Sequence, residues 1–208
     1  MTSSPATPRA LADRYVDAVC DLDPIVATSL GTRPGEDRLP DFSPEGLAAE
    51  AELDRRTLAG LDALPADDDP VERRCARLLR ERLSAQVDAH DAGEGLRQLS
   101  NLFSPVHSVR QVFSLMPTAT DDDWAVVGRR MARIPEAYRG FTAALREGAR
   151  RGLLVAPRQV RTVVGQLDEW LAGPYFGTFA AGAPDRLSAE LRTAAAAADE
   201  AVAEVRDY

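Results

Sequence analysis

Apolar residues recur every three or four positions along almost the whole chain of 208 residues, and proline or glycine interrupts the pattern at intervals. This spacing is typical of amphipathic α-helices, in which about 3.6 residues complete a turn. Proline fits the first turn of a helix and glycine the position just after its end, so the interruptions mark helix boundaries. Strand-like alternation of apolar and polar residues is almost absent. The pattern predicts an all-α fold, a multi-helix bundle of about eight antiparallel amphipathic helices without a significant sheet.

The boundaries of the predicted helices follow from these interruptions. Asp23-Pro24 breaks the first helix and restarts it, because aspartate can cap a helix N-terminus and proline suits the first helical position. Ser104 and Thr120 occupy the same capping position further along, and a carboxylate three residues after Thr120 completes a capping box. We expect one continuous domain over residues 1–208. Its helices are predicted to start near the following positions: Pro8, Pro24, Pro44, Pro70, Pro105, Asp121, Pro135, Pro157 and Ser188.

Two long connections without regular structure are expected, near residues 31–42 and 173–187. The second contains three aromatic residues, Tyr175, Phe176 and Phe179. Aromatic side chains in a loop either dock the loop onto the core or line a pocket, and the sequence leaves both roles open.

The stretch 101–116 carries more large apolar side chains than its neighbours, and we expect the other helices to converge on it. Its apolar positions share one helix face: Val106, Val109, Phe113 and Met116. His107 lies on the same predicted helix and is either a hydrogen-bonded structural histidine or a residue that faces a cleft. The candidate cleft-lining residues come from this stretch and from the aromatic loop: Asn101, His107, Arg110, Tyr175 and Phe176.

Charge and cysteine content narrow the class of protein. The chain has 33 acidic and 25 basic residues, and its formal net charge is -8. Phosphate binding needs a clustered basic face, so nucleic acid is not expected as a partner. Cys20 and Cys75 lie far apart among apolar helix positions, which favours two buried free thiols in a reducing compartment. Without an apolar targeting segment or a run of ~18 apolar residues, we expect a cytoplasmic protein that does not enter a membrane.

The sequence contains no complete catalytic or metal-binding motif. Zinc on a helix requires two histidines one turn apart, as in His-Glu-x-x-His, and neither His90 nor His107 has a second histidine at that spacing. We interpret His90 as a side chain favoured near a helix C-terminus. The phosphate-binding Gly-x-x-x-x-Gly-Lys motif needs lysine, which the chain lacks, and no carboxylate pair stands out among the 33 acidic residues. The residues therefore predict no catalytic group, no metal ligand and no enzymatic activity for this chain by itself.

Several segments together resemble the start of a large bacterial family labelled "domain of unknown function 885". They are Leu22-Asp23-Pro24 with Ala27-Thr28 and Gly31; Asp37-Arg38-Leu39-Pro40-Asp41 with Ser43-Pro44; Arg133-Ile134-Pro135; and Leu145-Arg146-Glu147-Gly148 with Arg151-Gly152 and Ala156-Pro157. The resemblance implies an all-helical fold similar to zinc carboxypeptidases and oligopeptidases of the gluzincin type. It also implies that zinc is bound in a C-terminal half, by His-Glu followed by Pro-Gly-His-His, and no residue of this sequence matches that motif. The chain resembles the N-terminal half, which in such folds builds one wall of the substrate cleft and part of its cover.

Two hypotheses about function follow. In the first, the chain is the non-catalytic half of a zinc-peptidase-like protein, faces a peptide or small-molecule substrate, and is completed by a C-terminal half or a complementing subunit. In the second, it is a standalone helical binding or assembly module that forms a homodimer. The final helix, residues 188–208, is still apolar on one face where the chain stops, so we expect a partner or a second copy to cover it. A small-molecule pocket under the stretch 101–116 is a third possibility.

Overall fold

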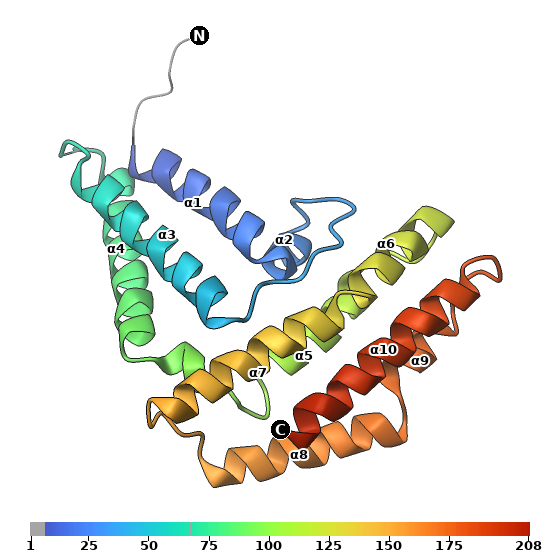
Figure 1. Cartoon of the computed structure of the whole chain (residues 1–208). Helices are drawn as coiled ribbons and strands as arrows, with labels where there is room; N and C mark the ends of the chain where they lie inside the picture. The colour runs from blue at the N-terminus through green and yellow to red at the C-terminus, as the bar shows by residue number, and fades with distance from the viewer. Residues whose placement is uncertain (1–6, 67) are drawn as a thin grey trace.

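The computed structural model describes residues 7–66 and 68–208. In these residues it contains ten α-helices, two 3₁₀ helices (η1 and η2) and no strand, which confirms the predicted all-α fold (Figure 1). In chain order the elements are α1 (Pro8–Leu22), α2 (Pro24–Leu30), α3 (Pro44–Asp62), α4 (Pro70–Asp91), η1 (Glu94–Arg97), α5 (Pro105–Val112), η2 (Phe113–Leu115), α6 (Asp121–Met131), α7 (Ile134–Arg150), α8 (Pro157–Ala172), α9 (Tyr175–Ala180) and α10 (Ser188–Asp207). Nine of these α-helices begin at or next to a predicted start, including the seven-residue α2, and only the six-residue α9 was not predicted.

Helices α1, α3 and α4 pack against one another and form an N-terminal group, shown in blue to green in Figure 1. The predicted break between α1 and α2 is confirmed, because the Asp23 carboxylate accepts hydrogen bonds from the backbone N–H groups of Ile25 (2.8 Å) and Val26 (3.2 Å). Gly31 ends α2 in the left-handed conformation, at φ 67°, which glycine adopts without a steric penalty.

The C-terminal group is built around α10, which lies against α6, α7, α8 and α9 (Figure 1). The stretch 101–116 contributes to its core as predicted: Val106, Val109 and Phe113 have no solvent exposure, and Met116 is also buried. A helix that buries this whole face cannot be removed without exposing the centre of the domain.

The apolar face of α10 is covered by other helices of the same chain. Leu191, Ala195, Ala198, Val202 and Val205 are all buried inside this chain, against the neighbouring helices. Helices α6 to α9 already remove this face from water, so its burial does not require a second surface. Self-association of the protein stays a prediction, without support from this face.

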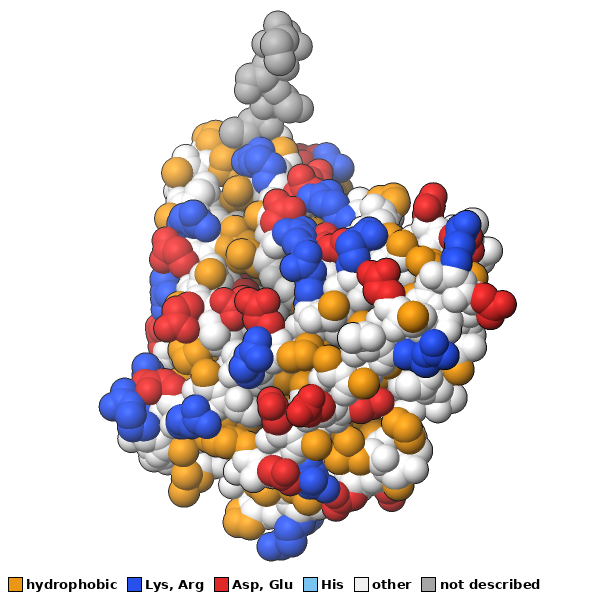
Figure 2. Space-filling model, turned by 45° about the vertical axis from the view of Figure 1, so that its right-hand side comes forward, with side chains coloured by type: hydrophobic (Ala, Val, Ile, Leu, Met, Phe, Trp, Pro, Cys, Tyr) orange, Lys and Arg blue, Asp and Glu red, His pale blue; other side chains and the backbone are white. Residues whose placement is uncertain are grey.

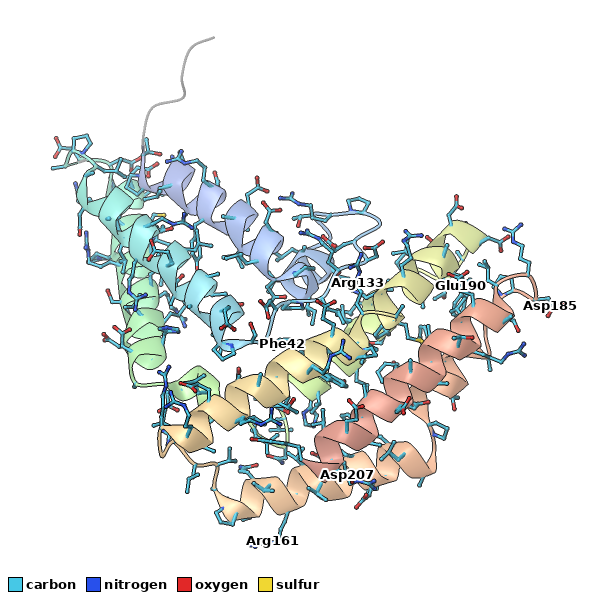
Figure 3. The ribbon with its side chains drawn as sticks, in the orientation of Figure 1. Phe42, Arg133, Arg161, Asp185, Glu190 and Asp207 are labelled. Atoms are coloured by element: carbon cyan, nitrogen blue, oxygen red, sulfur yellow. The ribbon has the colours of Figure 1, made fainter. Side chains whose placement is uncertain are left out.

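The two predicted irregular connections differ. Residues 31–42 contain no helix and run past α7, where a Cβ on Gly140 would lie 3.1 Å from the backbone nitrogen of Ser43; Figure 3 labels Phe42 beside this crossing. Residues 173–187 contain the short helix α9. It forms because Phe176 turns into the core, where its ring meets Phe113 edge to face at 5.6 Å.

Of the predicted N-terminal caps at Ser104 and Thr120, one forms its hydrogen bonds, and both cysteines are free. The capping box is confirmed, since Thr120 Oγ1 accepts from the Asp123 N–H and Asp123 Oδ2 accepts from the Thr120 N–H. Ser104 precedes α5 as predicted, but its hydroxyl makes no capping bond. Cys20 and Cys75 are both free thiols, and Cys75 is only partly buried.

The described surface is highly charged but mixed in sign. Acidic and basic side chains are interspersed on the face shown in Figure 2. Several form ion pairs within one helix, as when Glu147 accepts from both Arg150 and Arg151. Among the described helices, none combines the length and apolar character needed to cross a membrane.

Candidate functional site

A cavity of about 570 Å³ opens within the N-terminal group, and we call it the α1–α4 cavity. Helices α1, α3 and α4 form its sides, and the start of α2 and the segment from η1 to Ser100 complete it. A volume of this size is in the range of small-molecule sites. Its lining residues are Tyr15, Val19, Leu22, Asp23, Val26, Leu47, Glu50, Ala51, Leu53, Asp54, Gln86, Ala89, His90, Glu94, Gly95, Arg97, Gln98, Leu99 and Ser100.

Glu50 and Asp54 place two carboxylates of α3 in this cavity. They are four residues apart, so they lie one helical turn from each other on the same face. Asp54 is buried, with 6% of its surface exposed, and its Oδ1 accepts a 2.8 Å hydrogen bond from the Tyr15 hydroxyl on α1. Burial raises the pKa of Asp54, and the bond from Tyr15 opposes this effect by favouring the charged form.

Glu50 is exposed to solvent but lines the cavity, and it has no hydrogen-bonding or ion-pair partner among the described residues. The protein that encloses it removes part of the bulk water around its carboxylate, and the negative charges of Asp23, Asp54 and Asp41 add repulsion. Together these effects raise the pKa of Glu50 to about 7. The cavity thus holds a carboxyl group that exchanges its proton near neutral pH.

The other charged groups of the cavity are already engaged. Arg97 forms an ion pair with Glu94 inside η1. The Asp23 carboxylate accepts hydrogen bonds from the first turn of α2. Burial raises its pKa, and these hydrogen bonds oppose that rise. Arg55 and His90 oppose the rise in the pKa of Asp54, but the charges that act on Glu50 are only those of other carboxylates, so the cavity is negative beside Glu50.

The structure brings the five predicted cleft residues together, but at a different place. Gln166 on α8 donates from Nε2 to the backbone oxygen of Asn101 (3.2 Å), and its Oε1 lies 3.2 Å from Nε2 of His107. Nδ1 of His107 lies 2.7 Å from the Ser104 hydroxyl, which explains why Ser104 does not cap α5. Nε2 of His107 therefore connects α5 to α8, whereas Nδ1 contacts the residue that precedes α5.

Arg110 completes this second cluster. Its guanidinium carbon lies 4.2 Å from the ring centre of Tyr175 and 4.8 Å from that of Trp170, so its charge rests against two aromatic faces. Its Nε atom is buried without a hydrogen-bond partner among the described residues. Burial lowers the pKa of His107, and the Arg110 charge adds to that effect. None of the five predicted residues lines the α1–α4 cavity.

Sequence reasoning missed the residues of the α1–α4 cavity because many carboxylates share helical spacings. One signal does separate Asp54 from the rest. It lies three residues after Ala51 and four before Leu58, on the face that the pattern of α3 assigns to the core. A carboxylate on the apolar face of a helix needs a buried partner, and Tyr15 on the apolar face of α1 supplies it.

The residues described here do not fit a zinc ion. No three histidine, cysteine or acidic side chains are grouped as metal ligands in the part of the chain that the structure describes. His107 offers neither ring nitrogen freely, since Ser104 and Gln166 occupy both. No step of a reaction is therefore assigned to zinc in this chain.

The fold and its cavity define a helical protein with a mixed apolar and acidic pocket. The chain belongs to the family described as bacterial protein of unknown function (DUF885), whose model matches residues 24–208. This confirms the resemblance that the sequence segments indicated. A search of curated proteins finds no match to the chain.

Proposed function

We propose that this chain is the non-catalytic helical half of a zinc-peptidase-like protein and forms one wall of its substrate cleft. The observation that carries the proposal is the α1–α4 cavity, of whose nineteen lining residues fifteen lie in the segment matched by the family model. A mixed apolar and polar concavity held by three packed helices is suited to binding a substrate rather than to cleaving it. The substrate class is a peptide or another small molecule.

The chemistry of cleavage is assigned to residues outside this chain. The family resemblance implies a zinc motif in a C-terminal half, and the described residues offer no ligand set for that metal. We place the protein in a bacterial cytoplasm, because its two free thiols suit a reducing compartment.

The test is made on the natural gene product, isolated from its source cells with an antibody against this chain. The product is analysed by intact mass, zinc content and hydrolysis of a peptide mixture. We expect a zinc-containing protein, either a longer polypeptide or a complex of two, that cleaves peptides. The proposal is refuted if neither the product nor any protein that co-purifies with it contains zinc or cleaves a peptide.

The kinetic constants of variants of that product test whether the α1–α4 cavity contacts the substrate. We expect Glu50→Gln to change KM more than kcat, because Glu50 lines the cavity but supplies no chemistry. Glu52→Gln is the matched control, since Glu52 lies on the exposed face of the same helix. Equal kinetic constants for both variants would place the substrate elsewhere.

The alternative function is a homodimeric binding or assembly module. Exposed large apolar side chains among the described residues support this alternative, and the most exposed are Leu102, Phe103 and Leu154, at 64%, 80% and 68% exposure. Light scattering separates the two functions: a stable dimer without zinc favours the module, and a monomer or a complex with zinc favours the peptidase-like protein.

A further inference from the structure

The walls of the α1–α4 cavity divide into an apolar part and an acidic part. The apolar part comes from α1, α2, α3 and the segment after η1: Val19, Leu22, Val26, Leu47 and Leu99. The acidic part is the face of α3 that carries Glu50 and Asp54. A ligand that fills the cavity therefore meets carboxylates on one side and hydrocarbon on the other.

Positive charge reaches Asp54 from Arg55 and His90, whereas the charges that act on Glu50 are all negative. Arg97, the one arginine that lines the cavity, is paired with Glu94. Tyr15 is the one hydrogen-bond donor to Asp54 among the described residues, although this carboxylate is more than nine-tenths buried. Glu50 has no donor at all in the same part of the chain. Glu50 is exposed, but it faces the negative charges of Asp23, Asp41 and Asp54, and a bound cation would offset their repulsion.

We propose that the α1–α4 cavity binds an organic cation, a protonated amine attached to an apolar body, with the ammonium group beside Glu50 and Asp54. The inference rests on the proposed function only in that the amine would be part of the substrate. An ammonium group offers up to three hydrogen-bond donors, which match the unused acceptors of the two carboxylates. The hydrocarbon part of the ligand would lie against Val19, Leu22 and Leu47.

Ligands of other chemistry fit less well. A metal cation would need at least three converging donor side chains, and the described residues hold no such group. An anionic ligand would be repelled by the same carboxylates. A neutral apolar molecule of equal shape would leave Glu50 and Asp54 without a cation, so it provides the sharpest comparison.

The first experiment measures binding to the purified chain by calorimetry at pH 8. The probes are 4-phenylbutylamine and the neutral 4-phenylbutanol, which share the same hydrocarbon. We expect saturable binding of the amine that is at least about tenfold tighter than that of the alcohol, as one ion pair in a partly enclosed site would give. Equal affinity for both probes, or no saturable binding of the amine, would overturn the proposal.

Matched variants assign the binding to the cavity. Glu50→Gln should weaken amine binding about tenfold and leave alcohol binding unchanged. The variant is expected to fold, because Glu50 makes no internal hydrogen bond among the described residues, and circular dichroism checks this. Glu52→Gln, on the exposed face of α3, should bind the amine like the unmodified chain. Equal losses in both variants would show nonspecific attraction to a negative protein and refute the site.

Proton release provides an independent readout. The groups that face Glu50 are carboxylates from the α1–α2 junction, the segment before α3 and α3 itself, with Tyr15, His90 and the Glu94–Arg97 pair on the other walls. Because a bound ammonium favours ionised Glu50, amine binding should release a proton between pH 6 and 7, the range just below the pKa of about 7. Calorimetry in two buffers of different ionisation enthalpy measures this proton. No proton release, or the same release from Glu50→Gln, would contradict the assignment.

The outcomes for the site and for the proposed function are separable. Amine binding by the chain, with no zinc and no peptidase activity in the natural product, would keep this site and refute the peptidase-like function. Peptide cleavage by the natural product, with no amine binding to the chain, would refute this site alone.

Discussion

Arg130 donates a hydrogen bond from Nη2 to the carbonyl oxygen of Pro24 at 3.0 Å, and so ties α6 to the first turn of α2 across 106 positions of sequence. The Arg130 side chain is fully buried. It also donates from Nη1 to Thr28 Oγ1 and from Nε to the Arg38 carbonyl, both at 2.9 Å. One guanidinium therefore joins α6 of the C-terminal group to α2, which packs on α1 of the N-terminal group, and to the connection that follows α2.

Replacing Arg130 by methionine should destabilise the protein by roughly 2–4 kcal/mol, because three acceptors lose their donor while the side-chain volume is nearly kept. Urea unfolding followed by circular dichroism measures the free energy of unfolding. The control is Arg129→Met at the neighbouring position. Arg129 is half exposed and pairs with Asp37, so its loss should cost less than about 1 kcal/mol. Similar losses for the two variants would show that the buried bonds contribute little.

Gly148 is required where α7 meets η1. A Cβ at this position would lie 2.2 Å from the backbone oxygen of Leu96, and backbone cannot move aside as a flexible side chain can. We expect Gly148→Ala to cost roughly 1–3 kcal/mol. Because η1 lines the α1–α4 cavity, the variant should also weaken amine binding.

The matched control is Gly165→Ala on α8, where a Cβ meets nothing within 4 Å. There alanine should stabilise the helix by about 0.5–1 kcal/mol, since glycine is the poorer helix former. The midpoint temperature of thermal unfolding of each variant measures the two effects. If both substitutions shift the midpoint in the same direction, the close approach of α7 to η1 is not what limits the residue at Gly148.

The helices could be predicted from sequence because their signals are local. Proline at the start of α3, the Asp23 cap and the Thr120 capping box each act within four residues. Helix α9 was not predicted, because its formation depends on Phe176 packing against Phe113, more than sixty positions away. Packing against a distant part of the chain therefore determines the helical structure of this segment.

The candidate site was harder to predict for the same reason. The five predicted residues do gather in one cluster, but His107 and Arg110 there contact α8 and α9, which no local pattern indicates. The α1–α4 cavity depends on helices whose lining residues come from positions 15 to 100. Only Asp54, a carboxylate on an apolar helix face, was visible as an anomaly in the sequence.

Glu50 should make stability depend on pH. Its pKa is about 7 in the folded protein and about 4.3 in an unfolded chain, so the folded state binds the proton more tightly. This group therefore favours folding below about pH 4, and the advantage is lost as the pH rises through about 7. Solvent screens the exposed side chain, so we expect an effect on the order of 1 kcal/mol. Glu50→Gln should be more stable than the unmodified chain at pH 8, and urea titrations from pH 5 to 8 measure the difference. A constant difference over this range would contradict the assigned pKa.

His107 should produce the opposite dependence. Burial lowers its pKa in the folded protein, so the unfolded chain binds a proton more readily. The stability that His107 contributes is present above its unfolded pKa of about 6.5 and is lost as the pH falls below that value. We expect the unmodified chain to lose stability relative to His107→Gln between pH 7.5 and 5, because a charged imidazolium is unfavourable in this partly buried position beside the Arg110 charge.

Urea unfolding of both proteins at each pH measures this difference, in which the contribution of Glu50 cancels. His90→Gln is the matched control, because it removes the other histidine and leaves the contact between α5 and α8 intact. If His107→Gln follows the same pH profile as the unmodified chain, then burial beside Arg110 does not lower the pKa of His107 in the folded protein.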